Sequence, residues 1–159
     1  MPILHLQVTG EYKTLDGQTV AMPPKDALHQ KGATVQVTVG PAQSLVDQWN
    51  QQGIAVPALV AGEALIDTGA ANTCIDDVVA QQLGLPVVDV TTMVSASHTT
   101  QQNIYPIHLG VLGYLQFDVP RAMGANLAAS GIVALIGRDI LSMCTLHYNG
   151  AVGSFTLAI

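Results

Sequence analysis

Residues 63–76 read EALIDTGAANTCID, and this stretch decides the fold prediction. Small and apolar residues lead to one carboxylate, Asp67, which is followed at once by Thr68 and Gly69. The pattern is typical of a buried strand that ends in a tight turn, because glycine permits close backbone approaches. A carboxylate there is costly unless it is hydrogen-bonded or shares a proton with another acid. Asp67 is therefore either a turn residue that satisfies its own backbone or a reactive group.

A second apolar stretch, GIVALIGRDIL, occupies residues 131–141 near the end of the chain. It ends in Gly137, Arg138 and Asp139, from which a turn or two of helix is predicted. Together, ALIDTGA and ALIGRDIL resemble the two hallmark segments of the retropepsin-like aspartic protease family, in its single-domain members of bacterial or retroviral type. The resemblance covers roughly residues 33–159.

This resemblance implies a fold and a set of site residues. The fold would be all-β, a retropepsin-like acid protease barrel with one to three short helices. Asp67 would be the catalytic residue, and Thr68, Gly69 and Ala70 would support the active-site turn. The segment that contains Arg138 would pack against that turn beneath the active site.

Between the two segments the family places a flap, a hairpin that folds over the substrate. The candidate is MVSASHTTQQNIYPIHL, with strands near Met93–Ala96 and Asn103–Leu109. Its polar tip, which would contact the substrate, consists of His98, Thr99, Thr100 and Gln101. The tip lacks the glycine-rich run of viral members, and an ordinary surface hairpin is the alternative interpretation.

Peptide hydrolysis by an activated water uses two acids, one as a base and one as a proton donor. Two carboxyl groups ~3 Å apart share one proton and titrate as a pair. The sequence contains no second Asp-Thr-Gly or Asp-Ser-Gly. We therefore expect the second acid to be Asp67 of a symmetry mate in a homodimer. The apolar C-terminal strand, residues 154–159, is expected to pair with its mate across the interface.

Two positions bear on the details of this site. Ala70 has no hydroxyl that would stabilise the charged carboxylate, so we expect an activity optimum that is mildly acidic to near neutral. In viral members an acid follows D-T-G-A and pairs with the arginine of the second segment, but Ala71 stands here. Because an unpaired buried guanidinium is costly, Arg138 is expected to find Asp76, Asp77 or backbone carbonyls instead.

The rest of the chain shows the period-2 alternation of strands and few helical patterns. Strands are predicted near the start of the chain, over 33–40, as two short segments around 61–63, on both sides of 110–113, and over 153–159. Helices are predicted over 44–53, from a capping-box spacing at Ser44 and Asp47, and over 76–84, with Asp76 as N-cap.

A change of composition at residues 22–32 divides the chain into two parts. We expect an N-terminal extension over 1–31, either a strand or an arm that covers the cleft, and a protease domain over 32–159. The start of the chain resembles no secretory signal, so a cytoplasmic location is the default expectation.

Composition argues against several kinds of partner. The formal net charge is −6, with five Lys and Arg among 159 residues, which argues against nucleic acid. No apolar run approaches the roughly 20 residues that span a bilayer. The histidines show no metal-ligand spacing, so no metal and no cofactor are expected. Cys74 and Cys144 are expected to be reduced thiols in apolar surroundings.

The sequence thus predicts a homodimeric aspartic endopeptidase that binds an extended peptide or unfolded protein by strand-like hydrogen bonds. Four apolar residues are candidates for the cleft: Leu65, Ile104, Ile107 and Ile136. The alternative is a catalytically weak dimerisation or peptide-binding module with the same fold, or a regulatory domain whose N-terminal arm is inhibitory.

Overall fold

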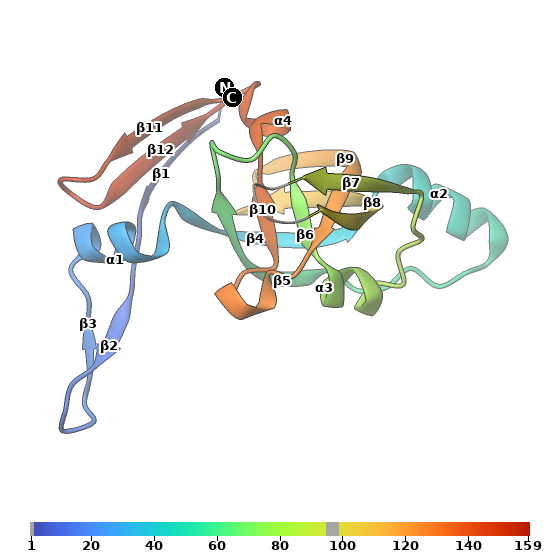
Figure 1. The fold of residues 1–159 in the computed structure, drawn as a ribbon. Helices are drawn as coiled ribbons and strands as arrows, with labels where there is room; N and C mark the ends of the chain where they lie inside the picture. The colour runs from blue at the N-terminus through green and yellow to red at the C-terminus, as the bar shows by residue number, and fades with distance from the viewer. Residues whose placement is uncertain (1, 95–98) are drawn as a thin grey trace.

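The computed structural model describes residues 2–94 and 99–159, and its centre is a closed barrel of six strands (Figure 1). In their order around the barrel, the strands are β4 (Thr34–Pro41), β5 (Val60–Ile66), β10 (Ala134–Ile136), β6 (Cys74–Asp76), β9 (Leu115–Ala125) and β8 (Thr99–Val111). Pairing of β4 with β8 closes the barrel, and β7 (Asp89–Val94) continues the sheet beyond β8. The predicted all-β barrel is confirmed.

The barrel forms because one side chain in two along its strands is apolar. Val35, Val37 and Val39 of β4 are 4%, 3% and 0% exposed, whereas the intervening Gln36 faces solvent. Ile107 and Leu109 of β8 are fully buried in the same core. The alternation therefore places one face of each strand inside the barrel and leaves the other face outside.

The long strand β8 pairs with two different strands along its length. Its first residues pair with β7, and its last residues pair with β4. The register against β9 shifts between Tyr105 and Ile107, at Pro106, which has no N–H to donate. This bulge separates the hairpin formed by β7 and the start of β8 from the barrel wall.

Two segments far apart in sequence meet at one barrel edge. β10 runs parallel to β5 and antiparallel to β6, with Leu135 opposite both Leu65 and Cys74. Because parallel strands end at the same edge of a sheet, Asp67 after β5 and Gly137 after β10 are brought side by side.

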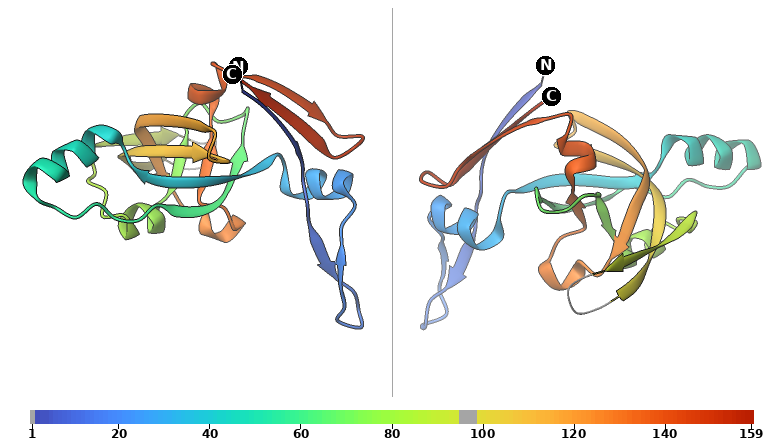
Figure 2. Two further views of the ribbon diagram at one scale, coloured as in Figure 1. Left: turned by 180° about the vertical axis from the view of Figure 1, so that it is seen from behind. Right: turned by 45° about the horizontal axis from the view of Figure 1, so that its top comes forward.

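The ends of the chain form a separate three-stranded sheet. Its order is β1 (Ile3–Gln7), β12 (Ser154–Ala158) and β11 (Thr145–Asn149), so β12 is paired on both sides within the chain. The expectation that this last strand pairs with a symmetry mate is therefore wrong, and only the outer edges of β1 and β11 are free to extend the sheet. Between β1 and the barrel, β2 (Glu11–Lys13) and β3 (Thr19–Ala21) form a hairpin that projects from the body (Figure 2).

The described residues contain four short α-helices, rather than one to three, and one 3-10 turn. These are α1 (Pro24–Lys31), α2 (Gln43–Gln52), α3 (Asp77–Gln82), α4 (Arg138–Leu141) and η1 (Ala128–Ser130). α1 was not predicted, because residues 22–32 were interpreted only as a change of composition between two parts of the chain, although Pro24 begins a helix there. None of the helices in residues 2–94 and 99–159 combines the length and apolarity that a bilayer crossing requires.

Other local predictions were right in part. Asp76 is the N-cap of α3 as expected. The capping box at Ser44 is wrong, since α2 begins at Gln43 without a side-chain cap and Asp47 instead accepts a hydrogen bond from the Gln43 amide at 2.8 Å. The two short strands expected around residues 61–63 are one continuous strand, β5.

Candidate active site

Asp67 lies at the barrel edge where β5 and β10 end together. Its backbone N–H donates to the Ile136 carbonyl at 3.0 Å, which continues the pairing of the two strands by one residue. Its carboxylate Oδ1 accepts a hydrogen bond from the Gly69 N–H at 2.7 Å, and the Ala70 N–H donates to the Asp67 carbonyl at 3.3 Å. The side chain is partly exposed. The turn therefore orients the carboxylate and leaves it accessible.

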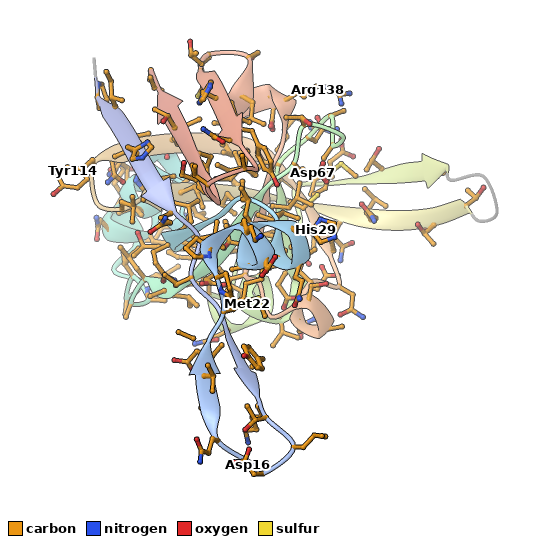
Figure 3. All side chains as sticks on the ribbon, turned by 90° about the vertical axis from the view of Figure 1, so that its left-hand side faces the viewer. Asp16, Met22, His29, Asp67, Tyr114 and Arg138 are labelled. Atoms are coloured by element: carbon orange, nitrogen blue, oxygen red, sulfur yellow. The ribbon has the colours of Figure 1, made fainter. Side chains whose placement is uncertain are left out.

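Arg138 holds this turn from the second segment. Its guanidinium donates through Nη1 to the carbonyl oxygens of Thr68 and Gly69, at 2.8 and 2.9 Å. Of the partners expected for Arg138, the backbone carbonyls are correct. The expected burial is wrong, because Arg138 is exposed (Figure 3). An exposed cation at the turn avoids the desolvation cost that burial would impose.

A second set of bonds joins the two segments beneath the turn. The backbone N–H groups of Arg138 and Asp139 donate to the carbonyls of Ala70 and Ala71, at 3.0 and 3.2 Å. Thr73, which is fully buried, donates its N–H and its hydroxyl to the Asp139 carboxylate at 2.9 and 2.8 Å. All three residues of the Gly137–Asp139 segment therefore lie against the Asp67 loop.

The sequence did not predict the part that Thr73 plays here, or the role of Gly137. The Thr73 hydroxyl accepts from the Gly137 N–H at 3.2 Å. A Cβ on Gly137 would lie 2.4 Å from the Asn72 carbonyl carbon, so the close approach requires glycine. A single threonine before a strand gives no signal that could have identified this bridge.

Asp76, one of the suggested partners of Arg138, serves a different purpose. It is 3% exposed and accepts from the N–H groups of Val78 and Val79 at the start of α3. Its other oxygen accepts from the N–H groups of Leu127 and Ala128, both at 2.8 Å. These four hydrogen bonds satisfy the buried Asp76 carboxylate and hold the loop that precedes η1 against the start of α3.

The predicted flap corresponds to the hairpin of β7 and the start of β8. Thr99, Thr100 and Gln101 are exposed, but they are the first residues of β8 and pair with β7, so their predicted place in the tip is wrong. His98 lies outside the described residues. Figure 3 shows this hairpin projecting on the side of the molecule that carries Asp67. At its base Arg121 donates to Asp89 at 2.5 Å, and this hydrogen bond lowers the pKa of the Asp89 carboxyl.

An apolar row crosses the outer face of the barrel beside the turn. Strand register aligns its members in neighbouring strands: Leu65, Leu135, Cys74, Met123 and Ile104. Of the four apolar residues expected near the cleft, Leu65 and Ile104 lie in this row. The other two, Ile107 and Ile136, are in the barrel core at 0% and 1% exposure.

A pocket of about 400 Å³ lies between this row and β7. Its lining combines the loop after Asp67 with three strands: Gly69, Ala70, Ala71, Asn72, Cys74, Thr91, Thr92 and Met123. None of these side chains is charged. Burial, with the nearby carboxylates of Asp139 and Asp67, raises the pKa of the Cys74 thiol to about 11.

Cys74 and Cys144 are both free thiols, as predicted. In the part of the chain that the structure describes, no three His, Cys, Asp or Glu side chains are grouped so as to hold a metal ion.

No family model matches the chain, and no curated protein matches it. Among solved structures, it is similar to the simian foamy virus (mac) protease, with 13% identity, a TM-score of 0.44, and coverage of 69% of this chain and 92% of that one. For a retropepsin-like aspartic protease from Rickettsia conorii, the identity is 14%, the TM-score 0.47, and the coverage 98% and 91%. For the retroviral protease-like domain of Ddi1 from Leishmania major, the identity is 15%, the TM-score is 0.39, and the coverage is 74% of this chain and 82% of that one. The described residues form a closed all-β barrel of six strands, and these structures are what that barrel is similar to.

Proposed function

We propose that this chain is an aspartic endopeptidase that acts as a homodimer, with one Asp67 from each copy. The observation that supports the proposal most strongly is the Asp67 turn itself. Its carboxylate is oriented by Gly69, accessible to solvent, and located at the end of an apolar face next to a pocket. The sequence supplies one such turn per chain, so a two-acid mechanism needs two chains.

In the proposed reaction, the two Asp67 carboxyl groups share one proton across a two-fold axis. The ionised carboxylate takes a proton from the attacking water, and the protonated one donates to the carbonyl oxygen of the scissile bond. Arg138 acts as a positioning residue, because its bonds to the Thr68 and Gly69 carbonyls fix the turn that holds the carboxylate.

The substrate would be an extended peptide or an unfolded protein. Strand-like backbone pairing with the flap residues Thr99, Thr100 and Gln101 would hold the chain over Asp67. The apolar row on the outer barrel face would contact its side chains, and the uncharged pocket would accept a neutral one. Copies would meet through the Asp67 turns and the outer edges of β1 and β11, which leave backbone groups unpaired. The domain limits of 1–31 and 32–159 and the cytoplasmic location stay predictions from the sequence.

The test is sedimentation of the purified protein over a range of concentrations, in parallel with cleavage of a peptide library. The proposal predicts that specific activity rises with the dimer fraction, and that Asp67→Asn abolishes cleavage without dissociating the dimer. Asp47→Asn is the matched control, because Asp47 lies on α2 and bonds only locally to Gln43. Full activity in a sedimenting monomer would contradict the proposal.

The alternative is a peptide-binding or dimerisation module with the same fold. It predicts that the wild type binds extended peptides but hydrolyses none of them, and that Asp67→Asn leaves binding unchanged. The same library, analysed for both binding and products, separates the two functions.

A further inference from the structure

Three residues lie in a line along the outer face of β5 and its continuation: Glu63, Leu65 and Asp67. Alternate residues of a strand point to the same face, with about 7 Å between successive members of the line. Glu63 is partly buried, and its position is fixed opposite Gln36 of β4. The Glu63 carboxylate thus lies on the same face of the strand as the proposed catalytic group, four residues before it.

A pocket of about 560 Å³ opens along this line, on the other side of Leu65 from the pocket described above. Leu65 and Ile132 form its apolar surface, and Glu63 also lines it. Gln30 and Lys31, the last residues of α1, line it from the N-terminal extension, and Gly131 lines it from the loop after η1. The pocket is therefore built from three separate parts of the chain.

The end of α1 is fitted tightly to this pocket. Gly32, which follows the helix, has a φ of +77°, and a Cβ there would lie 2.7 Å from Leu65 Cδ1. The N-terminal extension thus contributes a wall of the pocket next to Leu65.

The two charged residues of the pocket differ in where their charges are directed. The Lys31 ammonium donates to the carbonyl of Thr9 at 3.0 Å, outside the pocket lining, so the stem of Lys31 is left to line the pocket. Glu63 accepts a hydrogen bond from the Gln36 amide through Oε1 at 3.3 Å. Gln36 also lies outside the pocket lining, but among the described residues the other carboxylate oxygen of Glu63, Oε2, accepts no hydrogen bond, so it is the charged atom left for an occupant of the pocket.

We propose that this pocket binds a basic side chain, Lys or Arg, of the peptide that lies across Asp67. The aliphatic stem of that side chain packs on Leu65 and Ile132, and its cationic end pairs with the Glu63 carboxylate. The presence of a peptide at Asp67 is taken from the proposed function, on which this proposal rests. The proposal adds a substrate preference that is set by Glu63 and by the N-terminal extension.

The first test compares kcat/KM for peptides that carry arginine or the neutral norleucine at each position around the cleaved bond. The wild type is expected to prefer arginine at one position by about tenfold or more, and Glu63→Gln is expected to remove that preference. Glu11→Gln, which removes an exposed carboxylate from the β2–β3 hairpin, is the control and keeps the preference. Any one of three results would overturn the proposal. These are a wild type that shows no preference for a basic residue, a Glu63→Gln variant that keeps the preference unchanged, and a wild-type preference for glutamate that is lost in Lys31→Gln.

The second test does not need turnover. The Asp67→Asn protein is titrated with the matched arginine and norleucine peptides, and amide NMR shifts are followed at Gln30, Lys31, Gly131 and Ile132. Shifts at these residues with tighter binding of the arginine peptide support the pocket, even if the wild type cleaves nothing and the enzymatic function fails. Equal binding of the two peptides, or shifts elsewhere only, overturns the pocket proposal even if cleavage is observed.

Discussion

Thr73 donates both its backbone N–H and its hydroxyl to the two carboxylate oxygens of Asp139, at 2.9 and 2.8 Å. The two residues are 66 positions apart, one in the Asp67 loop and one in α4. The same hydroxyl accepts from the Gly137 N–H. This bridge fixes the second hallmark segment beneath the proposed catalytic turn, and Arg138 holds the turn from its outer side.

Replacement of the Thr73 hydroxyl tests the bridge. Thr73→Val keeps the shape of the side chain but removes one donor to Asp139 and leaves the Gly137 N–H without its acceptor. We expect a loss of about 1–3 kcal/mol in the free energy of unfolding, measured in urea. Thr19→Val on the exposed strand β3 is the control and should change stability by about 0.5 kcal/mol at most. Equal stability of the two variants would show that the bridge contributes little.

The contact between Gly137 and Asn72 can be tested with one methyl group. Gly137→Ala places a Cβ 2.4–2.9 Å from backbone atoms of Asn72 and Thr73, which are not free to move aside. We expect destabilisation of about 3 kcal/mol or more and loss of cleavage. Gly150→Ala is the matched control, since its Cβ would meet only the Tyr148 ring at 3.4 Å. A stable, active Gly137→Ala protein is incompatible with this packing.

The buried thiol predicts a dependence of stability on pH. The pKa of Cys74 is raised from 9.0 to about 11, so the folded state favours the neutral thiol. Stability is unaffected by this group below its unfolded pKa, and it falls as pH rises from about 9 to about 11, by at most about 3 kcal/mol because solvent screens a thiol that is not fully buried. Urea unfolding of the wild type and Cys74→Ser over this pH range measures the difference. Identical pH slopes for the wild type and Cys74→Ser would contradict the prediction.

Ala70 sets the expected pH range of activity. The alanine side chain has no donor for the Asp67 carboxylate. A serine hydroxyl at this position would donate a hydrogen bond and stabilise the charged form of the carboxylate. We expect a kcat/KM optimum that is mildly acidic to near neutral in the wild type, and one that moves to lower pH in Ala70→Ser. The profile is measured with one peptide from pH 3 to 8. A wild-type maximum near pH 3 would refute the prediction.

Much of the fold could be predicted because its signals are local. The alternating valines of β4 and the apolar runs before Asp67 and Gly137 specify strands, and Asp76 has the chemistry of an N-cap. The arrangement at the turn followed from the resemblance to a family with two hallmark segments. These segments lie side by side because β5 and β10 pair in parallel.

What escaped prediction depends on contacts between distant residues. The buried threonine and the close approach at Gly137 give no local pattern. The partner of Arg138 depends on which carbonyls the folded turn presents. The pairing of the last strand was also mispredicted, because the sequence does not show that β12 lies between β1 and β11. Pairing within the chain competes with pairing between chains, and only the structure decides between them.

The central claim is that each catalytic centre contains Asp67 from two copies, and a mixing experiment tests it most directly. Wild-type and Asp67→Asn chains are unfolded together in equal amounts and refolded, so that random pairing gives two intact Asp67 residues in about a quarter of the dimers. If the centre is shared, activity per total protein falls to about one quarter of the wild-type value, whereas activity of about one half, the value for independent single-chain sites, would rule out a shared centre.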